Sequence, residues 1–244
     1  MRSFRQKNDL SQLNLPTHVG IIMDGNRRWA KLRSLPIPSG HSAGASTFEK
    51  IAFYSNSIGL KYLTVFAFST ENWKRSKAEV SALMLLFKKQ LLRVIEKFKN
   101  ENIVVKFIGD ISKFSDDIQN LVKTIETETA NKTGLHLNIA MNYGSRQEII
   151  NCTKKIAQDV IENKLNPEDV TEEIFESKLF TREIPDVDLI IRTAGEKRLS
   201  NFLLWQSAYA EFYYTDILWP DFSEYEFDKA IEEYSTRNRK FGGK

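Results

Sequence analysis

The sequence predicts a single α/β domain with a central, mainly parallel sheet of six strands flanked by helices. Short apolar runs alternate along the chain with segments of helical periodicity, and the runs are continuously apolar. Such strands are buried on both faces, which is typical of parallel sheets. With 244 residues, 41% of them hydrophobic, the chain can bury one sizeable core. We expect strands at residues 19–23, 62–68, 103–108, 135–140, 189–192 and 212–215.

Helices between these strands are predicted from apolar periodicity and from capping signals. The longest begins near Ser76 and extends to about Phe98, with apolar residues recurring at a period of 3.6. Three pairs have the spacing of a capping box, in which a Ser precedes a Glu by three residues. They are Ser76 with Glu79, Ser145 with Glu148, and Ser223 with Glu226. Further helices are expected at residues 40–58, 115–129, 171–179 and 203–211.

Composition narrows the class of protein. A net charge of +3 is too small to argue for a nucleic-acid partner. Cys152 is the single cysteine, which excludes an intrachain disulfide and fits the reducing cytoplasm. No apolar run suits a signal peptide or a membrane span, so we expect a soluble protein. Residues 1–16 are polar and are expected to form a flexible N-terminal arm before one domain at residues 17–244.

A carboxylate followed by basic residues stands at the end of the first predicted strand. Asp24 ends the strand, a Gly-Asn pair follows, and Arg27 and Arg28 come next. Ligands of open α/β sheets bind outside the carboxyl ends of the strands, where guanidinium groups suit phosphate oxygens. Because Mg²⁺ binds through one or two carboxylates plus substrate phosphates, Asp24 is a candidate Mg²⁺ ligand. Alternatively, Asp24 is a turn residue that caps the next helix.

Polar residues also follow three later strands. The carboxyl ends of parallel strands share one edge, so these loops should converge on a cleft rich in Arg, amides and hydroxyls. Such a cleft favours a small polyanion, for example a diphosphate, over a duplex, although a solvated surface charge is the commoner role for each Arg taken alone. The residues are Ser69, Asn72, Trp73 and Arg75 after the second strand, Asn142 and Tyr143 after the fourth, and Arg192, Lys197, Arg198 and Ser200 after the fifth.

Two further features have alternative interpretations. Glu211 lies among aromatic residues, where a carboxylate is costly unless it is paired or bound to metal. It is therefore either a second Mg²⁺ ligand or half of a buried ion pair with an Arg. The apolar stripe between residues 80 and 98, with the fourth strand, either packs in the core or walls an apolar tunnel beside the sheet.

Absent motifs exclude other classes of enzyme. The sequence has no P-loop, no Gly-x-Gly-x-x-Gly and no His/Cys cluster with zinc spacing. The segment Gly40 to Gly44 matches the nucleophile elbow of hydrolases, with Ser42 as the nucleophile. However, the preceding residues contain two prolines and make a poor strand, and His136 is the only later histidine. We therefore disfavour a hydrolase.

Long, ordered stretches at residues 18–31, 66–75, 187–206 and 209–222, together with Gly40-His41, resemble the cis-prenyltransferases. Within that family the chain is most similar to bacterial undecaprenyl diphosphate synthases, over about residues 17–243. The resemblance implies a Mg²⁺-dependent transferase that adds isopentenyl diphosphate to an allylic diphosphate, usually farnesyl diphosphate, with cis double bonds. Undecaprenyl diphosphate, the cell-wall lipid carrier, is the expected product, and a short or irregular prenyl diphosphate is the alternative. A homodimer, no nucleic-acid partner and product release at a membrane surface are also implied.

The resemblance further assigns roles to residues of the domain. Asp24 would hold Mg²⁺ and assist departure of the allylic diphosphate, and Asn72 would share in catalysis. Glu211 would contribute to the metal of isopentenyl diphosphate. The residues expected to bind the allylic substrate are Gly25, Asn26, Arg27, Arg28, Trp29 and His41. A mobile loop that closes over the site would contain the substrate-binding residues Ser69, Thr70, Glu71, Asn72, Trp73 and Arg75. The residues expected to bind isopentenyl diphosphate are Arg192, Arg198 and Ser200.

Three positions depart from the family pattern. Ile37 stands where an Arg usually reaches the allylic diphosphate, and this bears on the identity or affinity of the starter. Arg27 replaces a common Gly, and either restores the charge or alters the shape of the site. Ser76 replaces a common Pro. A non-catalytic partner subunit is disfavoured because it would be expected to lack an acidic ligand such as Asp24.

Overall fold

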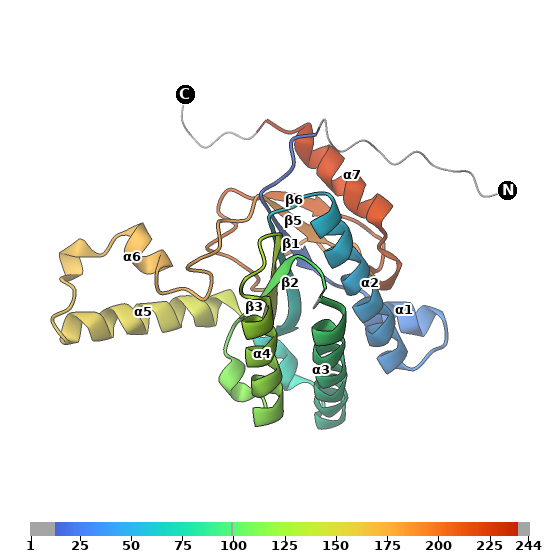
Figure 1. Ribbon diagram of the computed structural model, residues 1–244, viewed down its shortest axis with the longest axis horizontal. Coiled ribbons are helices and arrows are strands. Elements are labelled where there is room, and N and C mark those ends of the chain that lie inside the picture. The colour runs from blue at the N-terminus through green and yellow to red at the C-terminus, as the bar shows by residue number, and fades with distance from the viewer. Residues whose placement is uncertain (1–12, 99, 239–244) are drawn as a thin grey trace.

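β1 (His18–Ile22) lies at the centre of a six-stranded sheet in which every neighbouring pair of strands is parallel (Figure 1). This structure is a computed structural model that describes residues 13–98 and 100–238. The strand order is β3-β4-β2-β1-β5-β6, so the predicted α/β fold is confirmed. The other strands are β2 (Tyr62–Ser69), β3 (Ile103–Ile108), β4 (Leu135–Tyr143), β5 (Leu189–Arg192) and β6 (Glu211–Tyr214).

Helices cover one face of the sheet. The buried apolar side chains of α2, α3, α4 and α7 join those of the strands in one large core. By contrast, α5 and α6 project from the sheet as an arm (Figure 1). The helices are α1 (Asn26–Leu32), α2 (Ile37–Ser57), α3 (Lys77–Phe98), α4 (Asp116–Thr129), α5 (Ser145–Ile161), α6 (Glu172–Glu176) and α7 (Glu224–Ser235).

The other face is covered largely by irregular chain. Phe202 and Leu203 are fully buried there in a second, smaller apolar cluster. The helix predicted at residues 203–211 is wrong, since this segment forms consecutive turns and Leu203 has a φ of 45°. Tertiary contacts hold the turns in place, for example the bond from Gln206 Nε2 to the buried Glu148 carboxylate at 3.1 Å.

Two of the three predicted helix caps are present. The hydroxyls of Ser76 and Ser223 accept bonds from the backbone N–H three residues later, at 3.3 and 3.4 Å. Ser145 does not cap α5, because the preceding glycine holds the N-cap position. Its hydroxyl instead accepts from the backbone N–H of Leu204 at 2.7 Å, and thereby ties the irregular face to α5.

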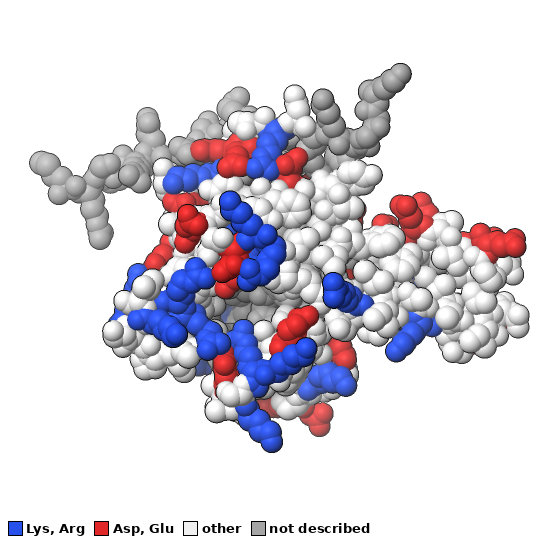
Figure 2. Space-filling view, turned by 180° about the vertical axis from the view of Figure 1, so that it is seen from behind, with Lys and Arg blue, Asp and Glu red and all other residues white. Residues whose placement is uncertain are grey.

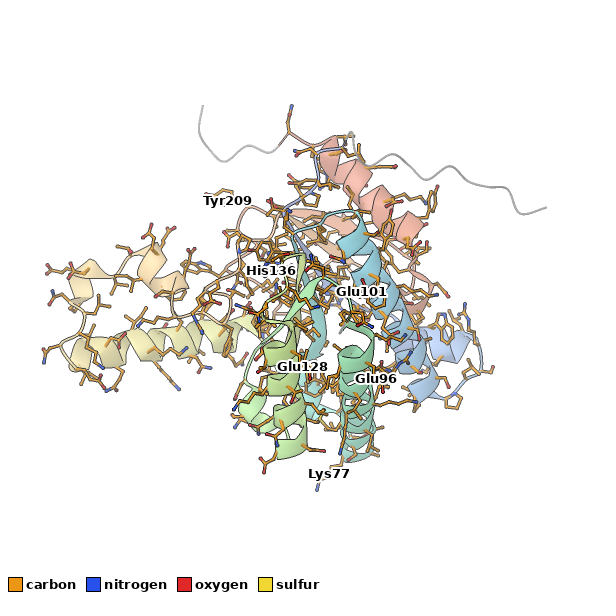
Figure 3. All side chains as sticks on the ribbon, viewed as in Figure 1. Lys77, Glu96, Glu101, Glu128, His136 and Tyr209 are labelled. Carbon is orange, nitrogen blue, oxygen red and sulfur yellow. The ribbon has the colours of Figure 1, made fainter. Side chains whose placement is uncertain are left out.

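The strands and α3 run in opposite directions. In Figure 3, Lys77 marks the start of α3 at the bottom of the view, and His136, near the start of β4, lies near the middle. Most of the predicted N-terminal arm and the end of the basic C-terminal segment lie outside the described residues, while Leu13 and Leu15 pack on the core. None of the described helices combines the length and the apolarity needed to cross a membrane.

Candidate active site

Asp24 lies two residues beyond the end of β1 and meets the last residue of the neighbouring strand β5. Its Oδ2 accepts a hydrogen bond from Nη2 of Arg192 at 2.9 Å. The chain leaves β1 toward β2 on one side and leaves β5 toward β6 on the other. A crevice at such a switch point is the usual ligand site of open α/β sheets. The predicted convergence of these two loops is therefore present in the fold.

Hydrogen bonds to Thr193 hold the backbone of Asp24, and Asp24 does not cap the following helix. The Thr193 hydroxyl donates to the Asp24 carbonyl at 2.7 Å and accepts from the Asp24 N–H at 3.0 Å. Gly25 is the N-cap of α1 with a φ of 109°, a left-handed conformation that favours glycine. The first turn of α1 has no side-chain cap, so the alternative of Asp24 as a capping residue is wrong. Its carboxylate is 37% exposed and faces a cavity.

Arg192 is buried and is surrounded by the loop that follows it. Its Nη1 donates to the Ser200 hydroxyl at 2.7 Å and to the backbone carbonyl of Arg198. Its Nε is buried without a hydrogen-bond partner. A buried guanidinium with an unmet donor favours an anion in the crevice, which would supply the missing partner.

The acidic residue Glu196 forms ion pairs with two further Arg residues at this edge of the sheet. It pairs with Arg28 at 3.1 Å and with Arg198 at 2.5 Å, and Arg28 also donates to the Ala194 carbonyl at 2.8 Å. The same two Arg residues, Arg198 first, lower the pKa of Glu196. Sequence reasoning missed this residue, although a lone acid between Arg192 and Arg198 was a usable signal.

A cavity of about 680 Å³ opens beside Asp24 and extends between the sheet and helices α2 and α3. Polar residues, including Asp24, Asn26, His41, Arg75 and Arg192, line one part of it. The remaining lining is largely apolar. It comes from α2, β2, α3 and β4, and includes Phe48, Val65, Phe66, Ala67, Phe68, Leu83, Leu86, Phe87, Leu91, Val94, Ile139 and Met141. The cavity thus has a polar mouth, defined by Asp24, Asn26, His41, Arg75 and Arg192, and an apolar body.

Two more buried polar atoms at the mouth lack partners, namely Asn26 Oδ1 and His41 Nε2. Burial, and then the nearby Arg75 charge, lower the pKa of His41, which favours its neutral form. The mouth is shaped by close approach of α2, because a Cβ on Gly44 would lie 2.2 Å from Asn26 Oδ1. Gly40 and Gly44 lie within α2 without a preceding strand, so the hydrolase motif is a packing feature.

The mouth is surrounded by basic side chains. Figure 2, which shows the side turned away in Figure 1, displays a hollow with Lys and Arg gathered around it and a few acidic side chains between them. Arg27 and Arg75 both pair with Glu79 at the start of α3, at 3.5 and 3.0 Å. The site therefore combines a net cationic rim with an adjoining apolar cavity.

Comparison with known proteins gives the family. The family model described as "Putative undecaprenyl diphosphate synthase" matches residues 22–242. The chain belongs to the cis-prenyltransferases. It is 48% identical over 239 residues to the isoprenyl transferase of Clostridium tetani, covering 98% of this chain and 94% of that one. It is also 48% identical over 235 residues to the ditrans,polycis-undecaprenyl-diphosphate synthase ((2E,6E)-farnesyl-diphosphate specific) of Haemophilus influenzae, covering 96% and 98%.

Solved structures agree with this assignment. Lavandulyl diphosphate synthase from Lavandula x intermedia, in complex with dimethylallyl diphosphate, has a TM-score of 0.91 and 38% identity, covering 94% of this chain and 99% of that one. A probable undecaprenyl diphosphate synthase from Campylobacter jejuni has a TM-score of 0.79 and 36% identity, covering 95% and 100%. The cis-prenyltransferase fold is therefore shared over nearly the whole chain.

The segment expected to be a mobile loop forms a short 3₁₀ helix, Thr70–Lys74. Its start is fixed by a bond from the Ser69 N–H to Asn72 Oδ1 at 3.1 Å. Glu71 accepts from Asn201 Nδ2 at 3.0 Å, which joins this cis-prenyltransferase segment to the loop after Arg192. The residues of the segment that line the cavity are Ser69, Glu71, Asn72 and Arg75.

Two residues of the same segment lie elsewhere. Thr70 and Trp73 line a second hollow of about 490 Å³. The Trp73 indole donates to Asn142 Oδ1 at 2.7 Å, and the Thr70 hydroxyl lies 3.4 Å from Gln147 Oε1. Their assignment to the substrate site is not supported by this geometry, because they anchor the segment on its other side.

Trp29 also turns away from the cavity. Its indole nitrogen donates to Asp221 at 2.7 Å, and the Arg33 guanidinium lies 4.3 Å from the centre of its ring. Trp29 lies in α1, and these contacts place its ring on the outer side of that short helix. Trp29 thus has structural partners here, and its contact with substrate stays a prediction.

Glu211 is at the wrong edge of the sheet to share a site with Asp24. It is the first residue of β6 and is level with Leu189, the first residue of β5. Its carboxylate pairs with Arg237 at 2.6 Å, as the ion-pair interpretation proposed. Over the described ranges, no group of three His, Cys, Asp or Glu residues could hold a metal ion. Within one chain, Asp24 and Glu211 therefore lie at opposite edges of the sheet, and the role of Glu211 in binding a metal stays a prediction.

Proposed function

We propose that this cis-prenyltransferase condenses isopentenyl diphosphate with an allylic diphosphate and extends the product as a cis-polyprenyl chain. One observation carries the proposal: the cationic mouth around Asp24 and Arg192 opens directly into an apolar cavity of about 680 Å³. The mouth suits two diphosphates, and the body suits the hydrocarbon attached to one of them. Farnesyl diphosphate is the expected starter, since relatives that are 48% identical are named for it.

The reaction breaks one C–O bond and forms one C–C bond. As the allylic diphosphate leaves, the allylic carbon is attacked by the double bond of isopentenyl diphosphate, and a proton is then lost from the neighbouring carbon. The mouth contains basic side chains that stabilise charge on the leaving diphosphate. Arg192, with Ser200, would bind the second diphosphate, and Asn26, Arg28 and His41 the first. The apolar walls would keep water away from the cationic carbon.

Asp24 fits a role as the protein's ligand to Mg²⁺. It offers a partly exposed carboxylate at the mouth, and Mg²⁺ is typically held by one or two carboxylates together with substrate phosphates and water. When bound, the ion would neutralise charge that develops on the leaving group. Asn72, which also lines the cavity, would help to orient the substrates.

A second candidate function is the synthesis of a short or irregular prenyl diphosphate. Its support is the TM-score of 0.91 with a lavandulyl diphosphate synthase, together with Ile37 at the start of α2 in place of the usual Arg. Incubation with farnesyl diphosphate, radiolabelled isopentenyl diphosphate and Mg²⁺, followed by chromatography of the products, separates the two. A labelled product near C55 supports chain elongation. A second incubation, with dimethylallyl diphosphate as the sole substrate, tests the irregular reaction, which a C10 product would support.

A homodimer, the cytoplasm as compartment and product release at a membrane surface stay predictions that rest on the resemblance. Light scattering of the purified protein tests the first of these. A mass of twice 28.2 kDa would support the dimer, and a mass of 28.2 kDa would refute it.

A further inference from the structure

Asn201 is a residue of the cavity lining that contacts two loops on which the proposed chemistry depends. It directly follows Ser200, whose hydroxyl accepts a hydrogen bond from Arg192 at 2.7 Å. Its own Nδ2 donates to Glu71 Oε1 at 3.0 Å, across 130 positions of the sequence. The Asn201 amide therefore connects the loop expected to bind isopentenyl diphosphate with the segment at residues 69–75.

The start of α5 fixes the orientation of this amide. Oδ1 of Asn201 accepts from the backbone N–H of Arg146 at 2.8 Å, and Nδ2 donates a second bond to Gln147 Oε1 at 3.3 Å. The backbone carbonyl of Asn201 accepts from the Ser145 N–H at 2.8 Å. Because a backbone N–H at a helix start can only donate, Oδ1 must face α5. The amide nitrogen is thereby directed at Glu71.

The backbone around Asn201 requires such an anchor. Ser200, Asn201 and Leu203 have φ values of 50°, 66° and 45°, in the left-handed region that residues with a Cβ seldom adopt. Asn is among the residues that tolerate this conformation best. A Cβ on Gly144 would lie 2.6 Å from Asn201 Nδ2, so the amide packs closely on the chain just before α5. These contacts fix the position of Ser200 as well.

The partner of Asn201 belongs to an element with little stability of its own. Glu71 lies in the 3₁₀ helix Thr70–Lys74, which has only five residues and also contains Asn72. A helix this short depends on contacts with its neighbours. A hydrogen bond to a carboxylate is stronger than one between neutral groups. The bond from Asn201 to Glu71 therefore helps to set the distance between Asn72 and the loop after β5.

We propose that Asn201 is a positioning residue that holds these two elements in register across the cavity mouth. Its amide sets the relative positions of Ser200, which would bind one diphosphate, and Asn72, which would orient the substrates. This inference rests on the proposed condensation of isopentenyl diphosphate with an allylic diphosphate.

The first test is Asn201→Asp, which preserves the shape of the side chain and an acceptor for the Arg146 N–H. It removes the donor to Glu71 and places two carboxylates against each other, which separates the two elements. We expect the KM for isopentenyl diphosphate to rise about tenfold and kcat to fall about tenfold. The KM for the allylic diphosphate should change less than about twofold, because α1 and α2 carry most of its expected ligands. Initial rates with each substrate varied in turn measure these constants.

A second substitution exchanges donor and acceptor. In the double variant Asn201→Asp with Glu71→Gln, the amide of the second residue can donate to the carboxylate of the first. We expect both kcat and the KM for isopentenyl diphosphate to return to within about threefold of the values for Glu71→Gln alone. A residue that only stabilised the fold would lower the melting temperature without this selective change in KM and without this rescue.

Asn163→Asp is the matched control. Asn163 is another exposed Asn in the left-handed conformation, with a φ of 55°, and it lies just beyond α5 on the projecting arm. Its substitution should leave all the constants unchanged. If Asn201→Asp does not fold, as judged by thermal unfolding, Asn201→Gly replaces it, since glycine keeps the left-handed backbone and lacks the amide. The same selective rise in the KM for isopentenyl diphosphate is expected.

Two results would overturn the inference while the proposed function stands. One is an active Asn201→Asp, or an active Asn201→Gly in its place, with constants close to those of the wild type. The other is a defect of Asn201→Asp that Glu71→Gln does not relieve, which would mean that the contact with Glu71 is not its cause. A wild-type protein that incorporates no isopentenyl diphosphate would instead refute the proposed function itself.

Discussion

The amino end of β1 and the cavity mouth at its carboxyl end contain similar buried polar residues. These residues are hydrogen-bonded at the amino end, whereas several of their atoms lack partners at the mouth. At the amino end, His18 is buried, with Nδ1 2.7 Å from the Pro185 carbonyl and Nε2 2.7 Å from the Thr64 hydroxyl. Asn138 donates to the same hydroxyl at 3.1 Å. This polar group, defined by His18, Thr64 and Asn138, is connected throughout by hydrogen bonds.

At the mouth, the corresponding atoms of His41 and Asn26 are buried without partners, as is Nε of Arg192. A buried donor or acceptor that stays unpaired costs about 1–3 kcal/mol, so these atoms favour a ligand that can pair with them. A ligand that supplies the missing partners recovers that free energy on binding. The comparison therefore indicates that His18 stabilises the fold, whereas His41 is placed to bind a ligand. Burial lowers the pKa of both side chains.

The largest effect is expected for Asp24→Asn, which removes charge from the mouth and keeps an acceptor for Arg192. Loss of the Mg²⁺ ligand should lower kcat about 1,000-fold. The melting temperature should change by less than about 3 °C. Incorporation of labelled isopentenyl diphosphate and a thermal scan measure the two quantities. Asp221→Asn, at a carboxylate on the outer side of α1, is the matched control, and activity within tenfold of wild type would contradict the role of Asp24.

Arg192→Ala should raise the KM for isopentenyl diphosphate about 100-fold, because a buried, charge-assisted contact to a diphosphate is lost. The KM for the allylic substrate should change much less. Initial rates with each substrate varied in turn give both constants. Arg33→Ala removes a guanidinium of α1's outer side and should leave both constants unchanged. A KM for isopentenyl diphosphate close to the wild-type value would remove Arg192 from that site.

At the amino end, His18→Leu should act on stability alone. It leaves the Pro185 carbonyl and Thr64 hydroxyl without their His18 partner, so the free energy of unfolding should fall by about 2–4 kcal/mol. Both KM values should be unchanged. Urea unfolding and steady-state kinetics measure these effects, and a changed KM would mean that the two ends of β1 are not independent.

The role of His18 can also be tested through the pH dependence of the free energy of unfolding. Burial lowers the pKa of His18 to about 4, whereas an unfolded His titrates near 6.5. The unfolded chain therefore binds this proton first, so the stability contributed by neutral His18 is full above pH 6.5 and is lost as the pH falls toward 4. The loss amounts to roughly 3 kcal/mol. Subtracting the unfolding curve of His18→Leu from that of the wild type isolates it, and parallel curves would contradict this assignment.

The smallest effect is expected for His41→Leu. It removes an unpaired nitrogen, so the free energy of unfolding should stay the same or rise slightly. The KM for the allylic diphosphate should rise about fivefold, which corresponds to the loss of one hydrogen bond of about 1 kcal/mol. A loss of stability as large as that of His18→Leu would show that His41 is a structural residue as well.

Much of the fold was predictable because continuous apolar runs specify buried parallel strands. The predicted strand ends were also nearly right, and the strand pattern therefore placed Asp24 and Arg192 at one edge of the sheet. The 203–211 segment was not predictable from its apolar pattern. Its course depends on the left-handed Leu203 and on bonds to α5, which are tertiary features without a local signal.

The sequence indicated which residue types lie near the site but not the directions in which their side chains point. Glu211 precedes its strand, and a residue before a parallel strand lies at the amino edge, opposite Asp24. Trp29, Thr70 and Trp73 are near the site in sequence, yet their side chains face the other side of a short helix. Helical turns of only five to seven residues carry too little apolar periodicity to reveal which side faces the cavity.

The pairing of β1 with β5 has a consequence for synthesis on the ribosome. Asp24 and Arg192 are separated by 168 positions, so the nascent polypeptide holds the carboxylate and the cavity walls long before the guanidinium emerges. Until then one side of β1 lacks its neighbour, and an open strand edge invites association with other chains. Catalytic competence therefore arrives only with the last quarter of translation, when β5 closes that edge and completes the site in the same step.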